Sequence, residues 1–321
     1  MNSKLICGIS AILDPKRSIH ALTVIRAIEI FKDLHNNSTL EFIFSEDYGS
    51  IEGGAKAAHY NIENNVDMVI GHFSSNAAIG AAEIYSHHNI PVLLPTATET
   101  TLTIKNSNIF RLCFNNKNIA HALAALIKED ENRYYEIKTD GSKYSNNLAE
   151  DILRMLGRND TEVKSNDNTD QIIFIGAIDK SEKFLHNYFS EKRDGKIILT
   201  DDAACKQLHL PENVENGQIT GIGFAPVEFI NPLESCIQRY IQQYDQFPNI
   251  FFLETFAALE IAHQLATPNN LLHRLQRETF QTTLGHIKFI KGECSAAKLC
   301  LWTNENSTMK PRYILPINSR A

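Results

Sequence analysis

The first third of the chain alternates short apolar runs with segments whose apolar residues recur at helical spacing. Apolar runs of this kind predict buried strands, and apolar positions three and four residues apart predict helices. The expected strands are 4–12, 40–45, 68–71, 91–94 and 108–114, and the expected helices are 21–34, 52–61 and 77–87. Because the strands are apolar throughout, we expect a parallel sheet with helices on both of its faces.

A second series of the same kind occupies the middle of the chain, and further helices and short strands follow it. The expected elements are strands 134–138, 172–175, 196–200, 285–290, 298–303 and 312–315, and helices 119–127, 147–156, 180–189, 231–244, 251–265 and 271–279. A chain of 321 residues is long enough for two domains. We therefore predict an α/β protein of two domains, in which the late helices can return to the first.

Two strands of the first series end in small polar residues, in the stretches VIGHFSS and VLLPTAT. Ser74 and Ser75 end the first stretch, and Thr96 and Thr98 end the second. In open parallel sheets, ligands bind beyond the carboxyl ends of the strands. Hydroxyl and main-chain N–H groups placed there can hold a small polar ligand without filling the space that it needs.

Charge and motifs exclude several classes of function. The net charge is −7 with a pI near 6.0, and no basic stripe interleaved with aromatic residues is present, which argues against nucleic acid as a partner. No apolar run approaches the ~20 residues of a transmembrane helix, so we expect no membrane insertion. The glycine-rich nucleotide-binding loops, G-x-S-x-G and H-E-x-x-H do not occur. We expect no cofactor and no metal.

A few titratable residues need separate interpretation. His87 and His88 are adjacent on a predicted helix, where side chains diverge by ~100°, so surface histidines are favoured over a metal site. His72 follows a strand, but a catalytic role needs a carboxylate partner that the sequence does not assign, and a structural role is favoured. Asp201 and Asp202 could form a paired acid site, although one carboxylate meeting a ligand cation is the simpler hypothesis.

Six scattered cysteines follow no metal-ligand spacing and predict reduced thiols, with a disulfide between Cys294 and Cys300 as the alternative. This pattern leans towards a reducing compartment. The apolar run 4–12 lacks the small-residue cleavage site of a signal peptide, and we interpret it as the first strand. The expected location is cytoplasmic if Met1 is the native start and periplasmic if a leader has been removed.

The polar stretches and the helix between them resemble a known family. V-I-G-H, a small hydroxyl pair, a helix ending in A-x-x-I-Y and then I-x-x-x-x-P-x-A-T are similar to the leucine/isoleucine/valine-binding branch of the type I periplasmic binding proteins. Weaker matches are Lys143-Tyr144 with Leu148-Ala149, and the helical segment 254–259. The resemblance extends over residues 1–300 and is strong over 66–103.

The resemblance implies a two-lobed α/β fold, in which each lobe is a parallel sheet flanked by helices. Three crossings of the chain join the lobes, which close on a small molecule held in the cleft between them. We place lobe 1 at 1–116 and 225–298, and lobe 2 at 117–224 and 299–321.

This chain also departs from the family pattern. Lobe 2 is expected to be reduced, because the segments 161–163 and 171–173 leave only about seven residues for a crossover that needs a dozen or more. The first-lobe disulfide of the family is missing, with Gly49 and Ser74 near its positions. In lobe 2, Ile178 stands where the family has an aromatic contact.

The family further implies which residues contact the ligand, an amino acid or a related zwitterion or amide. Ser75 matches the serine that contacts the ligand backbone, and Thr96 and Thr98 match the pair that binds the α-carboxylate and α-ammonium. Tyr144 matches the second-lobe tyrosine, and Asp201 stands where an acid meets the ammonium. The full expected set is Ser74, Ser75, Thr96, Ala97, Thr98, Tyr144, Ile178 and Asp201. Structural alternatives remain open: helix caps for Ser75 and Thr98, a core or surface tyrosine, and a turn residue at Asp201.

Three hypotheses for function follow. The first is a solute-binding protein that delivers an amino acid or related zwitterion to an ABC permease. The second is a cytosolic sensor on the same fold, similar to an amide receptor, which passes ligand occupancy to a regulatory protein. The third is an enzyme that uses His72 with Asp201 or Asp202 as acid and base. Because no constellation has both spacing and partner, we do not expect an enzyme.

Overall fold

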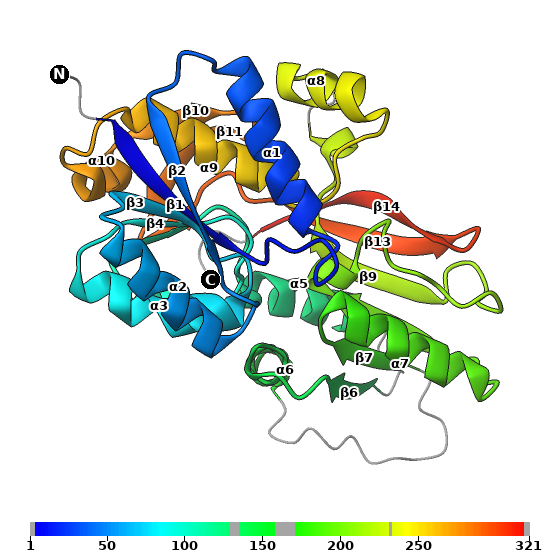
Figure 1. Cartoon of the computed structure of the whole chain (residues 1–321). Coiled ribbons are helices and arrows are strands. Elements are labelled where there is room, and N and C mark those ends of the chain that lie inside the picture. The colour runs from blue at the N-terminus through cyan, green and yellow to red at the C-terminus, as the bar shows by residue number, and fades with distance from the viewer. Residues whose placement is uncertain (1–3, 129–134, 158–170, 231–232, 318–321) are drawn as a thin grey trace. The chain divides into compact units, whose positions relative to one another are not determined.

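The computed structural model describes residues 4–128, 135–157, 171–230 and 233–317 (Figure 1). Its contacts divide the chain into two units, each built from two stretches. Unit 1 comprises Met1–Phe114 and Val227–Ala297, and unit 2 comprises Asn115–Pro226 and Lys298–Ala321. These limits lie within two residues of the limits predicted for the two lobes.

Unit 1 contains an eight-stranded sheet in the order β10-β11-β12-β5-β4-β3-β1-β2. The five strands of the N-terminal stretch pair in parallel, so their carboxyl ends share one edge. The strands are β1 (Leu5–Ala11), β2 (Leu40–Glu46), β3 (Met68–Gly71), β4 (Val92–Leu94), β5 (Ile109–Arg111), β10 (Thr279–Thr282), β11 (Gly285–Ile290) and β12 (Glu293–Cys294). The helices are α1 (Ala21–Leu34), α2 (Ile51–Glu63), α3 (Ser75–His87), α4 (Thr101–Lys105), α8 (Ser235–Tyr244), α9 (Phe252–Leu265) and α10 (Leu271–Arg277).

The central strands β1, β3 and β4 are covered on both faces, which explains why they are almost entirely apolar, whereas β2, β10 and β11 include exposed polar residues. In β3, Met68 and Ile70 belong to the core that includes side chains of α1, α8, α9 and α10 (Figure 1). Val69, between them, belongs to a second core with α2 and α3. Because successive strand residues point to opposite faces, a strand buried on both sides needs apolar residues at every position.

Two glycines allow α2 and α3 to pack closely. A Cβ atom at Gly54 would lie 2.0 Å from the carbonyl oxygen of Ala77, and one at Gly80 would lie 2.0 Å from that of Ile51. Any larger residue would therefore push the two helices apart. This close packing fixes the position of α3, whose first residue is Ser75.

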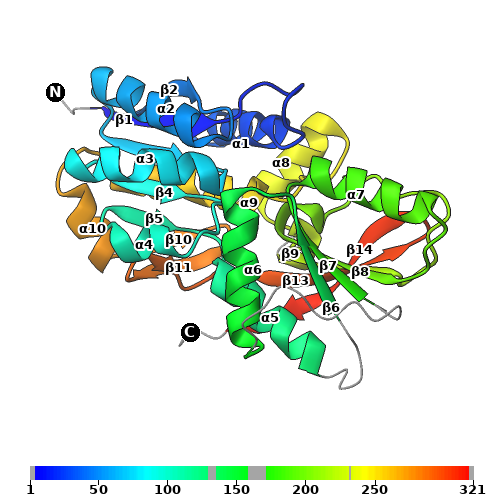
Figure 2. The ribbon, with the colours of Figure 1, turned by 90° about the horizontal axis from the view of Figure 1, so that it is seen from below.

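Unit 2 contains a six-stranded sheet in the order β14-β13-β9-β8-β7-β6. Strands β6 to β9 pair in parallel, and β13 and β14 form an antiparallel hairpin beside β9. The strands are β6 (Tyr135–Thr139), β7 (Gln171–Ile175), β8 (Lys196–Thr200), β9 (Ile219–Phe224), β13 (Leu299–Glu305) and β14 (Thr308–Leu315). The helices are α5 (Asn116–Lys128), α6 (Lys143–Met155) and α7 (Ile178–Ser190), of which α5 and α6 pack side by side (Figure 2).

The structure corrects some predicted limits. Helix α6 begins at Lys143 instead of residue 147, because the Ser142 hydroxyl caps it by accepting the Ser145 N–H. Helix α8 begins at Ser235, and the predicted start at 231 lies outside the described residues. Strands β9, β10 and β12 and helix α4 were not predicted.

Two further expectations concern the second lobe and the cysteines. The short crossover at 161–171, from which a reduced lobe 2 was predicted, falls almost entirely outside the described residues. None of the six cysteines forms a disulfide in the described structure, so the alternative pairing of Cys294 with Cys300 is wrong. In the portions of the chain that the structure describes, every helix is too short or too polar to cross a membrane.

Candidate functional site

The predicted residues of unit 1 lie at the carboxyl edge of its parallel strands. Ser74 precedes α3 and Ser75 begins it, both following β3, and Thr96 to Thr98 follow β4. Strands β3 and β4 are paired neighbours, so these two loops are adjacent. The structure therefore brings together all five residues predicted in the first lobe.

The Ser75 hydroxyl joins the two loops. Its oxygen accepts the backbone N–H of Thr98 at 3.1 Å and that of Glu99 at 3.2 Å, and Ser75 is 8% exposed. A serine oxygen has two lone pairs, and here both are used. What the Ser75 hydroxyl still offers is its hydrogen, which suits an acceptor such as a carboxylate oxygen.

The hydroxyls of Ser74 and Thr96 are used in the opposite sense. Ser74 Oγ donates to the carbonyl oxygen of Gly49 at 3.1 Å, and Thr96 Oγ1 donates to that of Phe73 at 2.8 Å. Both oxygens keep lone pairs, so they can accept a hydrogen bond from a donor such as an ammonium group. Ala97 is fully buried, and its carbonyl oxygen accepts from the Arg111 guanidinium at 2.6 Å.

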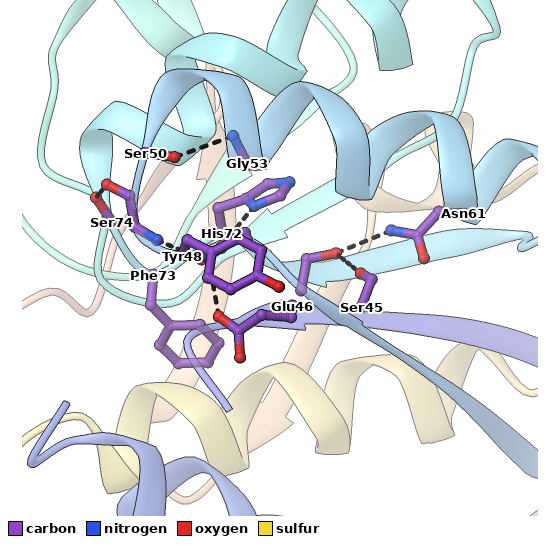
Figure 3. Close-up of polar contacts among 12 residues, drawn as sticks. Ser45, Glu46, Tyr48, Ser50, Gly53, Asn61, His72, Phe73 and Ser74 are labelled. Atoms are coloured by element: carbon purple, nitrogen blue, oxygen red, sulfur yellow. Dashed lines mark hydrogen bonds and ion pairs between the residues drawn. The ribbon is translucent and has the colours of Figure 1, made fainter. Parts of the chain in front are cut away.

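His72, at the same edge, forms a buried hydrogen-bonded pair with Asp47 that the sequence did not reveal (Figure 3). Its Nδ1 lies 2.7 Å from Oδ2 of Asp47, and both side chains are 1% exposed. Asp47 follows β2 and His72 follows β3, and both strands flank β1. The shared edge of neighbouring parallel strands is the signal that could have identified Asp47 as the partner.

This pair continues into a buried polar network. Nε2 of His72 lies 3.4 Å from the Tyr85 hydroxyl, which accepts from the Asn61 amide at 2.8 Å. Asn61 also donates to Ser10 Oγ at 2.8 Å. Both ring nitrogens of His72 are thus engaged inside unit 1, which supports the structural role predicted for it over acid–base chemistry.

Asp47 also orders the loop that meets Ser74. Its Oδ1 accepts the Gly49 N–H at 2.9 Å, and the Gly49 carbonyl is the acceptor for Ser74. Beside it, the Glu46 carboxylate accepts the N–H groups of Leu13 and Tyr48, both at 2.9 Å. The edge of unit 1 is therefore held by hydrogen bonds among its own loops.

The predicted residues of unit 2 also lie at the carboxyl edge of a parallel sheet. Asp201 follows β8 and begins a short 3₁₀ turn with a φ of 58°, Ile178 begins α7 after β7, and Tyr144 lies in the first turn of α6 after β6. Burial, followed by the nearby charge of Asp201, raises the pKa of Tyr144 well above its ordinary value. The Tyr144 hydroxyl therefore keeps its proton and can donate it in a hydrogen bond.

Carboxylates dominate this second edge. Burial and the charge of Asp201 raise the pKa of Asp202, although its carboxylate accepts the Ile178 N–H. Burial alone would raise the pKa of Asp140, but hydrogen bonds from Ser145, Ser142 and Ala177 outweigh it and lower that pKa. The raised pKa of Asp202 favours its neutral form, so the negative charge at this edge comes from Asp140 and Asp201, and it favours a cation.

His87 and His88 were predicted to be surface histidines and not the ligands of a metal. In the described parts of the chain, no three His, Cys, Asp or Glu side chains are grouped so that they could hold a metal ion. His88 Nδ1 lies 2.9 Å from the carbonyl oxygen of Ile84, one turn earlier on α3, and both His87 and His88 are exposed.

The known sequences that this chain resembles are periplasmic binding proteins. A family model described as periplasmic binding protein matches residues 26–171. The Leu/Ile/Val-binding protein homolog 3 of Brucella melitensis biotype 1 is 25% identical over 109 residues, which span 33% of this chain and 30% of that protein. Homolog 2 of Brucella abortus is 28% identical over 79 residues, spanning 24% of this chain and 21% of that protein. The matches thus span only about a fifth to a third of these relatives' length.

Solved structures align over nearly the whole chain. A leucine-binding protein from Thermotoga maritima superposes with a TM-score of 0.84 at 16% identity, covering 98% of this chain and 99% of that one. A branched-chain amino acid transporter substrate-binding protein of Streptococcus pneumoniae, in complex with isoleucine, gives 0.81 at 14% identity, covering 97% and 99%. A solute-binding protein of Rhodopseudomonas palustris, in complex with 3,4-dihydroxybenzoic acid, gives 0.80 at 11%, covering 98% of each. At such identities the likeness establishes the two-lobed α/β fold.

Proposed function

Because this chain is a divergent member of the type I periplasmic binding proteins, we propose that it binds an amino acid or a closely related zwitterion as a solute-binding protein. The carboxyl edge of unit 1 offers a hydrogen-bond donor that suits a carboxylate, and the carboxyl edge of unit 2 carries aspartates that suit an ammonium group. No specific observation favours the sensor or the enzyme among the hypotheses from sequence.

The observation that carries this proposal is the arrangement of the Ser75 hydroxyl. With both lone pairs accepting the amides of Thr98 and Glu99, it is restricted to donating, and a ligand carboxylate is the acceptor that such a donor suits best. Ser74 and Thr96 keep acceptor capacity at the same edge, which suits the ammonium bound to the same carbon atom.

The acidic edge of unit 2 narrows the ligand class. The solved neighbours hold ligands of two kinds, leucine or isoleucine on one side and aromatic acids such as 3,4-dihydroxybenzoic acid on the other. Both kinds carry a carboxylate, but only the amino acids carry an ammonium. The charge of Asp201, with Asp140 at the same edge, favours a ligand with a positive charge, and therefore an amino acid.

The partner and compartment that we propose follow the role of the family. The structural neighbours include substrate-binding proteins of ABC transporters, so we propose an ABC permease as the partner and a location outside the cytoplasmic membrane. Cell fractionation of the native host with an antibody to the chain tests the location. Recovery in the cytosol alone would contradict this part of the proposal.

Calorimetry tests the ligand. The chain is unfolded and refolded to remove any ligand carried through purification, and is then titrated with leucine, isoleucine and valine. Two analogues test the two charges: 2-hydroxyisocaproate lacks the ammonium, and leucinamide lacks the carboxylate. We expect an amino acid to bind, and each analogue of leucine to bind about tenfold or more weakly, because 2-hydroxyisocaproate leaves Asp201 without a cation and leucinamide leaves the Ser75 hydroxyl without a charged acceptor. Binding of 4-hydroxybenzoate but of no amino acid would overturn the proposal.

A further inference from the structure

A buried guanidinium in unit 1, that of Arg111, donates hydrogen bonds to main-chain carbonyls of the segment 97–99. Arg111, the last residue of β5, has a side chain with no exposed surface. Its Nη1 donates to the carbonyl oxygen of Ala97 at 2.6 Å, and its Nη2 donates to that of Glu99 at 2.7 Å. Both groups of the guanidinium fork therefore bind the carbonyl oxygens of the two residues that flank Thr98.

The opposite side of the same segment is held by Ser75. The two carbonyls of Ala97 and Glu99 are fixed by Arg111, and the two amides of Thr98 and Glu99 are fixed by the Ser75 hydroxyl. Thr98 itself is fully buried. A residue held by main-chain bonds on both sides has little freedom to move its side chain, and a preorganised site binds its ligand more tightly.

The third donor of the guanidinium joins it to a distant part of the chain. Arg111 Nε lies 3.3 Å from the carboxylate of Glu293, which is the register partner of Arg111 on β12. The Glu293 carboxylate also accepts from the Thr103 hydroxyl at 2.5 Å. Glu293 is partly exposed, so Arg111 is the member of this pair that is withdrawn from water.

Withdrawing a cation from water is unfavourable, and apolar residues of similar volume often replace a buried ion pair without loss of stability. A buried arginine is therefore weak support for stability. Its planar fork, however, can hold two acceptors in a fixed geometry, which neither an apolar residue nor a lysine can do.

We propose that Arg111 is a positioning residue for ligand binding, and that it acts by fixing the segment 97–99 without contacting the ligand. The proposal rests on the proposed function, because it assigns Thr98 and Ser75 to the ligand site. It predicts that loss of Arg111 weakens binding out of proportion to any loss of stability.

The chain offers a matched control. Arg274 in α10 is also a guanidinium that donates to two main-chain carbonyls, those of Leu265 at 2.6 Å and Gln264 at 3.3 Å, and it pairs with Glu278. It belongs to the same unit but holds a segment that contains no predicted ligand residue. Arg274→Met therefore removes a similar clamp without touching the site.

Two measurements are made on Arg111→Met, Arg111→Lys and Arg274→Met, at a temperature where circular dichroism shows each variant folded. The first is hydrogen exchange of the Thr98 and Glu99 amides in the ligand-free protein, and the second is the dissociation constant for leucine. We expect Arg111→Met to accelerate exchange and weaken binding by about tenfold each, with Arg111→Lys between it and the wild type. Arg274→Met should change only the melting temperature.

The outcomes separate the two proposals. If Arg111→Met and Arg274→Met lower the melting temperature while both leave exchange and affinity unchanged, Arg111 is structural and the inference fails. If Arg111→Met does not fold, Arg111→Lys decides by the same two readouts, because it retains the buried charge and loses the fork. If the wild type binds no amino acid, the proposed function fails, and the exchange rates still show whether Arg111 fixes the segment.

Discussion

The carboxyl edges of the two sheets are built from different chemistry. At the edge of unit 1, hydroxyls and main-chain groups bond to one another, Asp47 and His72 form a buried hydrogen bond, and the charge of Arg111 is buried and paired with Glu293. At the edge of unit 2, aspartates gather, and the charge of Asp201 contributes to the raised pKa of Asp202. One edge is thus suited to an anionic group and the other to a cationic group, as the two ends of an amino acid require.

The two units also differ in where burial raises the pKa of a carboxyl group. In unit 2 that group is Asp202, at the edge of the sheet. In unit 1 two carboxyl groups of the core helix α9 have a pKa raised by burial to about 7: Glu254, which lies in the first turn and is 6% exposed, and Glu260. We expect titration of Glu254 to affect stability, and the carboxylates of unit 2 to affect binding.

The largest expected effect concerns Glu254. Because its folded pKa lies above its ordinary value of 4.5, the folded state binds the proton more tightly than the unfolded state between about pH 4.5 and 7. Stability should therefore be highest below this window and fall as the pH rises through it. The loss is at most about 3 kcal/mol, from a shift of roughly two and a half pKa units. Chemical denaturation between pH 4.5 and 8 measures it.

Glu254→Gln should remove the share of Glu254 from this pH dependence and leave that of Glu260, and it should make the protein more stable than the wild type at pH 8. Glu63→Gln, at the exposed end of α2, is the control and should leave the profile unchanged. A wild-type profile that rises between pH 5 and 8, or one that Glu254→Gln does not alter, would contradict the assignment.

Asp201→Asn tests the cationic side of the comparison. Removing the charge opposite a ligand ammonium should weaken leucine binding by about a hundredfold, since hydrogen bonds to charged groups contribute roughly 1.5–3 kcal/mol. Binding of 2-hydroxyisocaproate, which has no ammonium, should change little. Calorimetry with both compounds gives the two ratios.

Asp179→Asn provides the matched control for this experiment. Asp179 lies in the first turn of α7 at the same edge, but its side chain is half-exposed and paired with Lys180. We expect no more than a small change in affinity. If Asp179→Asn and Asp201→Asn weaken leucine equally, the effect arises from the general negative field of unit 2 and not from a specific contact.

How much of the secondary structure the sequence predicted depends, in both units, on how deeply each element is buried. Apolar runs and helical spacing predicted β3 and β8 with their limits as the structure has them, because burial on both faces leaves a continuous signal. Short exposed elements such as β10 were missed, since they carry no such pattern. The resemblance supplied the candidate residues at both edges, and their contact with a ligand stays a prediction.

The interactions that the sequence could not reveal depend on three-dimensional contacts between distant residues. Asp47 and His72 are 25 residues apart, and Arg111 and Glu293 are 182 apart. Nothing in the local pattern distinguishes Arg111 from a surface arginine at a strand end. The Glu293 carboxylate reaches Arg111 because β12 pairs with β5, and local propensity does not encode that pairing.

A cross-link at the edge of unit 1 tests whether that edge is already fixed without ligand. A Cβ atom at Gly49 would lie 3.8 Å from Cβ of Ser74, which is a typical separation for a disulfide. Closing this loop should stabilise the protein by about 3 kcal/mol, and the left-handed φ of 62° at Gly49 should offset about 1 kcal/mol of that. The stabilisation is reduced further because Ile12 must move: its Cδ1 would lie 2.9 Å from the new Cβ atom at residue 49.

We therefore expect oxidised Gly49→Cys/Ser74→Cys to melt at a higher temperature than the same variant with dithiothreitol. Leucine affinity should be the same in both redox states, because the edge is already held by its own hydrogen bonds. A cross-link that abolishes binding would show that this loop must move, and the two edges would then differ less than we infer.

The smallest expected effect comes from the hydroxyls of unit 1. Ser75→Ala together with Thr98→Ala should weaken leucine binding by about tenfold, which is less than the effect of Asp201→Asn because neutral hydroxyls are lost instead of a charge. Leucinamide lacks the carboxylate that we assign to Ser75, so its affinity should fall less than that of leucine. Calorimetry with the two compounds gives this ratio, and the single variants divide the effect between the residues.

Ser75→Ala also frees the amides of Thr98 and Glu99, so a loss of affinity could reflect disorder of the segment instead of a lost contact with the ligand. Hydrogen exchange of these two amides separates the causes. Faster exchange with an equal loss for leucine and leucinamide indicates that Ser75 positions the segment. A greater loss for leucine indicates direct contact with the carboxylate. Unchanged affinity for both compounds in the double variant would remove Ser75 and Thr98 from the site, and with them the chemical contrast between the two edges.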